Sequence, residues 1–231
     1  MRFDILTIFP TIIDSYINEG VIGRSINYKK NITVKTHNIR DYTKDIHKKV
    51  DDSPFGGGAG MILQIEPIYA ALNNIINKYP DTKKHIILTK AGANIFSQNK
   101  AIKLGEDFDH IIFICGRYEG IDARVEQYLS NESLSIGKYV LTGGELPALV
   151  MLDAIARHIP EVLGNQESLE QESWTNNQHQ EYPQYSRPAI FRPDNPKLVN
   201  NNTPLEWTVP EILLSGNHQA IKDWREENRK E

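Results

Sequence analysis

The sequence predicts an α/β protein whose parallel sheet is covered by helices on both faces, and three observations lead to this prediction. Short apolar runs of the kind that is buried in parallel sheets occur at His85–Leu88 and His110–Cys115. Segments with the periodicity of amphipathic helices alternate with such runs, as at Glu66–Tyr79. The chain has 231 residues, of which 39% are hydrophobic, which is ordinary for a globular protein that folds without disulfides or a structural metal. Alternation of strands and helices is typical of a sheet with two covered faces.

The elements are expected in the following order along the chain. Two β-rich segments come first, at Phe3–Ile8 and Ile32–His37. The amphipathic helix Glu66–Tyr79 and the two buried strands come next. The remaining helices are expected at Ser97–Leu104, at Asp122–Leu129 and from Pro147 to about Arg157, where a proline in the first turn is tolerated. Six of the 12 prolines lie between Pro183 and Pro210, so that segment is expected to be an extended connector that leads to a helical C-terminal tail.

Composition excludes several classes of protein. The net charge of −4 argues against a general polycation, and the single cysteine, Cys115, excludes a disulfide framework or a zinc site with several cysteines. No stretch approaches 18 apolar residues and no secretory leader is recognisable, so we expect a cytoplasmic protein that does not cross a membrane. The seven histidines are scattered without paired spacing, so no metal ligands are assigned.

Glycines are concentrated in two clusters, which indicates binding loops. The clusters hold nine of the 15 glycines, namely Gly56, Gly57, Gly58, Gly60, Gly116, Gly120, Gly137, Gly143 and Gly144. Glycine lets a ligand approach the backbone closely. In open parallel sheets ligands bind beyond the carboxyl ends of strands, and three loops are expected there: Thr89–Gly92, Gly116–Gly120 and Ser135–Pro147.

Standard nucleotide and hydrolase signatures are missing. The sequence contains no complete G-x-G-x-x-G, no G-x-x-x-x-G-K-[ST], no H-E-x-x-H and no G-x-S-x-G. The segment from Arg24 to Lys49 contains eight basic residues and two acidic ones. This excess of positive charge suits either an RNA-contacting face or an ordinary solvated surface. Residue patterns alone therefore predict an α/β protein with glycine-rich ligand loops and a basic edge.

Longer motifs resemble those of one family, the bacterial tRNA (guanine-37-N1)-methyltransferases (TrmD) of the SPOUT superfamily. The resemblance covers about residues 1 to 228, and four motifs in the right order make it specific. The motifs are VDDSPFGGGAGM at 50–61, CGRYEGID at 115–122, SIG…GELPA at 135–148 and LLSGNH at 213–218.

This resemblance implies a fold, a reaction and partners. It implies a SPOUT-type parallel sheet with a deep C-terminal trefoil knot and a small helical C-terminal domain. The corresponding domains are a methyltransferase domain over 1–160, a flexible linker over 161–181 and a tRNA-contacting domain over 182–231. The implied reaction is S-adenosyl-L-methionine-dependent methylation of N1 of guanosine 37 in tRNA, by a homodimer with shared active sites. A requirement for a divalent ion such as Mg²⁺ is left open.

Residue roles follow from the matched positions. The implied cofactor-binding residues are Leu88, Thr89, Gly116, Tyr118, Glu119, Gly120, Ser135, Ile136, Gly137, Lys138, Tyr139, Val140, Leu141, Gly143, Gly144 and Pro147. The implied substrate-binding residues are Arg24, Gly58, Gly60, Glu181, Arg187, Asn217 and His218. Arg157 matches an arginine expected near guanine O6, and Glu119 matches the acid expected at the ribose or sulfonium of the cofactor.

The expected catalytic base departs from the family pattern. The family places an aspartate in an Asp-Ser-Phe context, whereas this chain has Glu172-Ser173-Trp174. Glu172 keeps the carboxylate but adds a methylene, and catalytic geometry is sensitive on that scale. Glu172 is the predicted base, with Glu170 and Glu181 as alternatives. Lys90 and Lys138 also replace residues usual in the cofactor loops.

Three other functions compete with this prediction. The first is methylation of another RNA by a SPOUT enzyme. The second is binding of tRNA with catalysis weakened at Glu172. A nicotinamide-dependent oxidoreductase is disfavoured because the dinucleotide fingerprint is missing.

Overall fold

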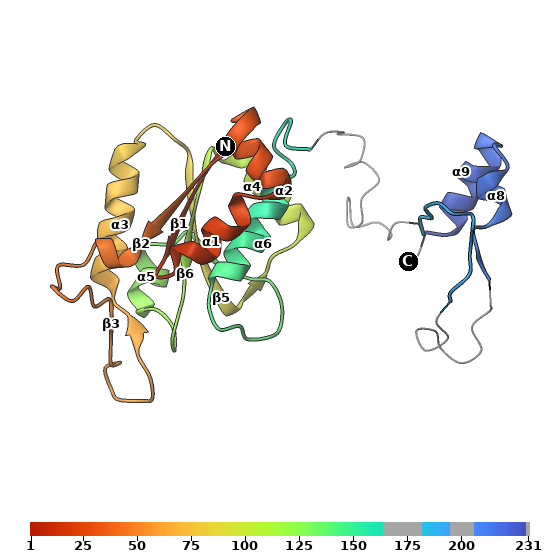
Figure 1. Cartoon of the computed structure of the whole chain (residues 1–231). Coiled ribbons are helices and arrows are strands. Elements are labelled where there is room, and N and C mark those ends of the chain that lie inside the picture. Colours follow the sequence, from red (N-terminus) through yellow and green to blue (C-terminus); the bar gives the residue numbers. More distant parts are fainter. Residues whose placement is uncertain (164–181, 195–205, 230–231) are drawn as a thin grey trace. The chain divides into compact units, whose positions relative to one another are not determined.

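Five parallel strands form the sheet in the N-terminal part of the chain (Figure 1). The strands are β1 (Arg2–Thr7), β2 (Thr33–Asn38), β5 (Lys84–Ile95), β6 (His110–Cys115) and β7 (Glu132–Ser135). They lie in the order β2-β1-β6-β5-β7, and every neighbouring pair is parallel. The predicted α/β class with a parallel sheet is therefore confirmed.

The computed structural model describes residues 1–163, 182–194 and 206–229. Two compact units can be separated, Met1–Gln166 and Glu167–Glu231, and each is considered by itself. Most of the predicted linker, 161–181, lies outside the described residues.

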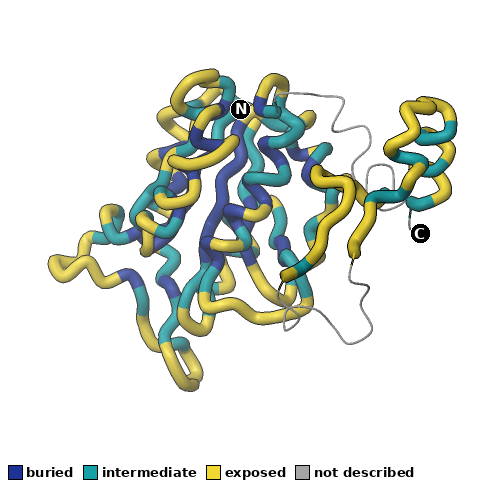
Figure 2. Tube along the Cα trace, turned by 45° about the vertical axis from the view of Figure 1, so that its right-hand side comes forward, coloured by how far each residue is buried: buried dark blue, intermediate teal, exposed yellow. Residues whose placement is uncertain are grey.

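Strand β6 runs through the middle of the core and is buried on both faces (Figure 2). Because successive side chains of a strand point to opposite faces, its residues belong to two different apolar clusters. Ile111, Phe113 and Cys115 join one cluster. Ile112 and Ile114 join the other. Because both faces of β6 are buried, apolar residues occupy successive positions, which is the continuous run that predicted a buried parallel strand.

Helices cover both faces of the sheet, as predicted. Helices α1 (Pro10–Ile17), α2 (Gly20–Arg24), α4 (Gln98–Asp107) and α6 (Glu145–Ala156) pack on one face (Figure 1). Helices α3 (Ile65–Lys78) and α5 (Ala123–Tyr128) pack on the other. A π-helical turn at Ser25–Lys29 follows α2, a 3₁₀ turn at Ile39–Asp41 follows β2, and the two-residue strands β3 (Asp51–Asp52) and β4 (Ile62–Leu63) pair on either side of the first glycine cluster.

Helix starts differ slightly from the prediction, for reasons of capping. Ser97 and Asp122 were expected inside helices, but each sits one residue before its helix and accepts a backbone N–H, from Lys100 and Arg124 respectively. Such side chains satisfy N–H groups that have no partner within the helix. The helix expected to open at Pro147 begins two residues earlier, at Glu145. Proline is tolerated there because the first turn needs no N–H donor.

Periodicity did not predict α1, α2 or β7, and it predicted β5 too short. The sequence of β7 is ESLS, which has no apolar run, and the strand is recognisable only by its pairing with β5 at the sheet edge. The loop expected at Thr89–Gly92 lies inside β5, which continues to Ile95.

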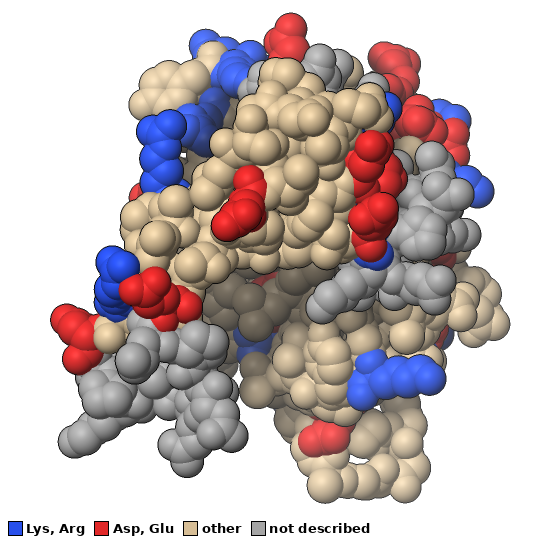
Figure 3. Space-filling model, turned by 90° about the vertical axis from the view of Figure 1, so that its right-hand side faces the viewer, with Lys and Arg blue, Asp and Glu red and all other residues tan. Residues whose placement is uncertain are grey.

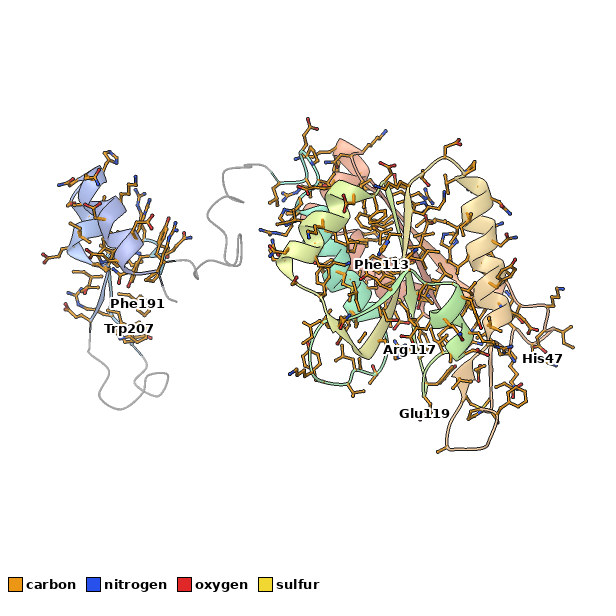
Figure 4. The ribbon with its side chains drawn as sticks, turned by 180° about the vertical axis from the view of Figure 1, so that it is seen from behind. His47, Phe113, Arg117, Glu119, Phe191 and Trp207 are labelled. Carbon is orange, nitrogen blue, oxygen red and sulfur yellow. The ribbon has the colours of Figure 1, made fainter. Side chains whose placement is uncertain are left out.

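The second unit is small. Strands β8 (Ile190–Phe191) and β9 (Trp207–Thr208) pair antiparallel, and helices α8 (Glu211–Leu214) and α9 (His218–Glu227) follow. The Phe191 and Trp207 rings are 5.5 Å apart between centroids (Figure 4). None of the described residues of this unit is buried. Of the prolines in the segment that the structure describes, Pro183, Pro188 and Pro193 lie outside helices and strands, and Pro210 is the N-cap of α8. Among the helices that the structure describes, none has the length and apolar character that a membrane crossing requires.

A buried charge cluster joins β1, β2 and β6. Asp4 is fully buried, and its carboxylate is hydrogen-bonded to Nε2 of His110 at 2.6 Å, to Nε2 of His37 at 2.5 Å and to Nε of Arg2 at 2.5 Å. Burial by itself would raise the pKa of Asp4, but the hydrogen bonds from these three partners outweigh it and hold the pKa well below its ordinary value. Asp4 therefore stays a carboxylate in the folded protein.

Candidate functional site

A cavity of about 400 Å³ opens beside an irregularity within β5 and beyond the carboxyl ends of β6 and β7. This is the edge at which parallel α/β sheets bind ligands. Three separate stretches of chain line the cavity, around 88–92, 116–126 and 134–147. Its volume lies within the range of small-molecule sites.

A bulge in β5 forms the first wall. Thr89 and Asn94 both lie opposite Leu134 of β7, so residues 90–93 leave the ladder between them. Lys90 lies on this bulge and contacts Glu126 of α5 through a 2.6 Å ion pair. Hydrogen bonds from Lys90 and Ser133 hold the pKa of Glu126 below its ordinary value. The lysine that departs from the family pattern therefore has a partner in this chain.

The turn after β6 forms the second wall. Tyr118 and Gly120 have positive φ angles of 59° and 140°, a conformation that side chains rarely adopt. Backbone hydrogen bonds hold this turn to the segment next to the first glycine cluster. The Glu119 N–H donates to the Met61 carbonyl at 3.1 Å, and the Leu63 N–H donates to the Gly120 carbonyl at 3.0 Å. The Glu119 side chain is exposed.

The segment before α6 forms the third wall, and it approaches the other two without room for side chains. The Gly144 N–H donates to the Gly116 carbonyl at 2.9 Å. A Cβ at Gly144 would lie 2.0 Å from Oγ1 of Thr89. Glycine is therefore required here by packing. The cavity wall is backbone, which supplies N–H and C=O groups to a ligand.

A buried ion pair lies beside this wall. Glu145 is 1% exposed, and its Oε2 atom accepts a 2.9 Å hydrogen bond from Nε of Arg117. Burial, and secondarily the Glu145 charge, raises the pKa of the neighbouring Cys115 thiol well above its ordinary value. Cys115 is fully buried and neutral, so it is no nucleophile.

Most of the predicted cofactor residues come together in this cavity. Thirteen of the 16 line it: Leu88, Thr89, Gly116, Tyr118, Glu119, Gly120, Ser135, Ile136, Tyr139, Leu141, Gly143, Gly144 and Pro147. The other three, Gly137, Lys138 and Val140, belong to the same loop but are not part of the lining. Lys138 and Val140 are exposed. Figure 4 shows Arg117 and Glu119 at the same end of the sheet.

Arg157, the predicted cation near guanine O6, does not line this cavity. It is the C-cap of α6, whereas Pro147 near the start of that helix lines the cavity. Ten residues of helix separate them, which is about 15 Å at 1.5 Å per residue. Arg157 lines a second hollow of about 350 Å³ with Tyr16 and Asp153. The Tyr16 hydroxyl donates to Oδ2 of Asp153 at 2.5 Å, which raises the pKa of Tyr16 to about 12.

The other predicted residues are dispersed. Glu172, its alternative Glu170, and Glu181 lie outside the described residues. Gly60 is next to the cavity, since a Cβ there would lie 2.5 Å from Cγ of Glu119. The remaining positions are not part of the cavity lining: Arg24 ends α2, Gly58 lies in the loop between β3 and β4, and Arg187, Asn217 and His218 belong to the second unit.

Arg117, Glu145 and Glu126 were not singled out as functional residues from the sequence. The available signal for Arg117 and Glu145 was that each lies within a glycine motif, at 116–120 and 143–147. Within the part of the chain that the structure describes, no group of three or more His, Cys, Asp or Glu residues is placed to hold a metal ion.

Comparisons with known proteins agree with this geometry. A family model described as "tRNA (Guanine-1)-methyltransferase TrmD" matches residues 1–231. A tRNA (guanine-N(1)-)-methyltransferase of Clostridioides difficile is 44% identical over 229 residues, which cover 98% of this chain and 91% of the relative. One of Staphylococcus haemolyticus is also 44% identical, over 99% of this chain and 86% of the relative.

A solved structure is similar as well. The crystal structure of the tRNA (m1G37) methyltransferase from Aquifex aeolicus matches with a TM-score of 0.76 and 33% identity, over 97% of this chain and 87% of that chain. The resemblance that the motifs indicated is therefore confirmed: the chain belongs to the tRNA (guanine-1)-methyltransferase family.

Proposed function

We propose that this chain transfers a methyl group from S-adenosyl-L-methionine to N1 of guanosine 37 in tRNA. The observation that carries the proposal is the backbone-lined cavity beside the irregularity in β5 and beyond the carboxyl ends of β6 and β7, in a chain that matches the methyltransferase family over its whole length. The proposal includes a cytoplasmic location, which suits a tRNA substrate.

The cavity fits a nucleoside-containing methyl donor. Its glycine walls can present N–H and C=O groups to an adenine edge, and a side chain at Gly144 would collide with Thr89 and Gly116 in the other walls. Glu119 makes no side-chain hydrogen bond within the described part of the chain, so its carboxylate is free to bind ribose hydroxyls or to stabilise a positive sulfonium. When bound, S-adenosyl-L-methionine supplies the electrophilic methyl group. The proposed binding residues are the 16 positions given above.

The acceptor atom requires a base and a cation. N1 of guanine carries a proton, and its removal spreads negative charge onto O6. A carboxylate within hydrogen-bond reach would accept the proton, and an arginine near O6 would stabilise the charge. Glu172 is proposed as the base and Arg157 as the cation.

The position of Arg157 supports a homodimer with shared active sites. Arg157 is about a helix length from the cavity of its own chain, so a second subunit is needed to bring the two together. Helix α6 is apolar on almost every side. Leu146 and Val150 are exposed and lie on the same face as Asp153 and Arg157, next to the exposed Tyr16 of α1. An apolar face of this kind beside a ligand site suits a subunit interface.

The chain path supports the proposed trefoil knot. After the edge strand β7 the chain passes the turn that follows β6, where the Gly144 and Gly116 backbones bond, and α6 then packs against β6 and β1 in the middle of the sheet. A knot over the last part of 1–160, a linker over 161–181 and a tRNA-contacting domain over 182–231 remain part of the proposal.

The proposed tRNA contacts are Arg24, Gly58, Gly60, Glu181, Arg187, Asn217 and His218. Phosphates would supply much of the affinity, and the target base would be read on its Watson–Crick edge. On the face shown in Figure 3, basic and acidic side chains are interspersed among uncharged ones.

Mass spectrometry of tRNA after incubation with the full chain and S-adenosyl-L-methionine tests the proposal. We expect one added methyl on guanosine 37 of a tRNA transcript and none on a transcript with adenosine at that position. Parallel reactions with and without Mg²⁺ measure the divalent-ion requirement. Methylation at another nucleotide, or none on any tRNA, would contradict the proposed function.

The same assay tests the base. Glu172→Gln should lower the rate of transfer by about 10²–10⁴-fold, the contribution of a general base, with the donor Kd unchanged. Glu170→Gln is the matched control and should retain activity. Full activity of Glu172→Gln would remove Glu172 from the mechanism, and a loss in Glu170→Gln or Glu181→Gln would assign the base there.

A further inference from the structure

A single ion pair joins three segments that are far apart in the sequence. The Arg117 side chain, in the turn after β6, donates from Nε to Oε2 of Glu145 at 2.9 Å. The other carboxylate oxygen, Oε1, accepts a 2.6 Å hydrogen bond from the hydroxyl of Thr7 at the end of β1. The side chains of Arg117 and Glu145 are 16% and 1% exposed. Both carboxylate oxygens are thus satisfied away from water, where a lone charge would be costly.

The Arg117 guanidinium is held from two more directions. Its Nη1 donates to the Thr142 carbonyl at 3.0 Å, and its Cζ lies 4.6 Å from the centre of the Phe9 ring. A Cβ at Gly143 would lie 2.2 Å from Nε of Arg117, so the guanidinium lies directly against the backbone of the third cavity wall. The planar fork of arginine suits several simultaneous contacts, which the point charge of a lysine cannot reproduce.

These contacts lie in the cavity wall itself. Arg117, Thr142, Gly143 and Gly144 all line the cavity. The second and third walls are therefore joined by the Arg117 contacts with Glu145 and the Thr142 carbonyl, in addition to the backbone hydrogen bond from Gly144 to Gly116.

We propose that Arg117 is a positioning residue for the methyl donor. Paired with Glu145, it fixes the spacing between the turn at Gly116–Gly120 and the segment Thr142–Gly144, and so shapes the donor cavity before the donor binds. The inference rests on the proposed function, because it concerns the same cavity. A preformed cavity spares the donor the cost of ordering two loops, so the effect falls on donor affinity.

Two variants of the full chain separate positioning from folding. Arg117→Gln leaves Glu145 buried without its cation and should lower thermal stability as well as donor affinity. Arg117→Lys keeps a cation for Glu145 and should recover most of the stability, but it loses the fork that also reaches the Thr142 carbonyl. The control is Arg192→Gln, which removes an arginine from an exposed ion pair with Glu206 outside the cavity lining.

The readouts are the Kd of S-adenosyl-L-methionine by calorimetry, the Kd of tRNA, and the melting temperature. We expect the donor Kd to rise about tenfold or more in Arg117→Gln, equivalent to about 1.4 kcal/mol. It should stay raised several-fold in Arg117→Lys although the melting temperature recovers. The tRNA Kd should change less than about twofold in both Arg117 variants. Arg192→Gln should match the unmodified chain in donor Kd and melting temperature.

The outcomes distinguish the inference from the proposed function. If Arg117→Lys binds the donor as tightly as the unmodified chain, the positioning role is wrong and the pair serves the fold alone. If Arg117→Gln does not fold, the donor Kd of Arg117→Lys alone decides the outcome. If the unmodified chain itself does not bind S-adenosyl-L-methionine, the proposed function fails and not merely the role of Arg117.

Discussion

At Gly144 the chain passes Thr89 so closely that no side chain fits between them. A Cβ there would lie 2.0 Å from Oγ1 of Thr89 and 2.8 Å from the amide nitrogen of Gly116. Both neighbours belong to cavity walls, and the buried Thr89 hydroxyl is already engaged with the Ile114 carbonyl at 3.1 Å. The close approach of the cavity walls therefore depends on the absence of a side chain at position 144.

Gly144→Ala should therefore separate the walls. We expect a donor Kd at least tenfold higher and a loss of about 1–3 kcal/mol in the free energy of unfolding, as for other overpacked sites. Calorimetry and denaturant titration measure the two effects. Gly105→Ala is the matched control: its Cβ would meet Ile159 at an ordinary 3.6 Å inside α4, so stability should be unchanged or higher by about 0.5–1 kcal/mol. Donor binding by Gly144→Ala as tight as in the unmodified chain would contradict the close-packing argument.

The sequence specified some of these residue-scale features and not others. The second glycine cluster identified cavity loops because glycine itself marks close backbone approach, whereas the first cluster, Gly56–Gly60, is not part of the lining. The pairing of Arg117 with Glu145 and Thr7 was not predictable, because it depends on where three distant segments return in space.

At the scale of elements, the Asp4 cluster joins three neighbouring strands of the sheet, β2, β1 and β6, through charge. It links β1 to β2 through His37 and to β6 through His110, at residues that lie outside the lining of the donor cavity. Because the pKa of Asp4 is lowered in the folded protein, its contribution to stability is complete above about pH 4, the ordinary aspartate value. The contribution is lost as the pH falls further, through the lowered pKa.

Asp4→Asn should show this dependence directly. At pH 7 we expect the free energy of unfolding to fall by about 3–5 kcal/mol, the usual cost of breaking a buried ion pair. The difference from the unmodified chain should shrink as the pH falls below about 4, as followed by thermal unfolding at a series of pH values. Asp107→Asn, at an exposed position, should give no such convergence. A constant difference at all pH values would show that the Asp4 charge is not responsible.

Helices and strands were predicted correctly where a single local sequence pattern identified them. β6 was recognisable because both its faces are buried, and α3 because its apolar positions follow a helical period. β7 was not, because its stability comes from pairing with β5 rather than from its own composition. The bulge of β5 was expected as a loop, since a local pattern cannot indicate that the strand resumes at Asn94.

At the scale of the whole molecule, the proposed homodimer would bring together two parts of the reaction site that lie apart in one chain. The donor cavity and Arg157 lie at opposite ends of α6, and an exposed apolar face lies between them. The family resemblance implied shared active sites, whereas composition and periodicity contained no sign of them.

Mixed dimers test this arrangement. Arg157→Ala and Gly144→Ala homodimers should each be inactive. A mixture that is unfolded, combined 1:1 and refolded should regain about a quarter of the unmodified activity, because half of the dimers are mixed and each has one intact site. Methyl transfer to tRNA is the measurement, and refolding each variant alone is the control. Absence of recovery, with mixed dimers shown to form, would place both residues in the same subunit's site.

The single thiol of the chain has a practical consequence. Cys115 is fully buried immediately before the turn that forms the second cavity wall, and the chain has no other cysteine. A sulfhydryl reagent can modify Cys115 only when the end of β6 opens locally. The rate of labelling therefore measures how often this local opening occurs. A ligand that binds between the three cavity walls should slow the labelling of Cys115. The labelling rate of the unmodified protein therefore reports whether the cavity is occupied.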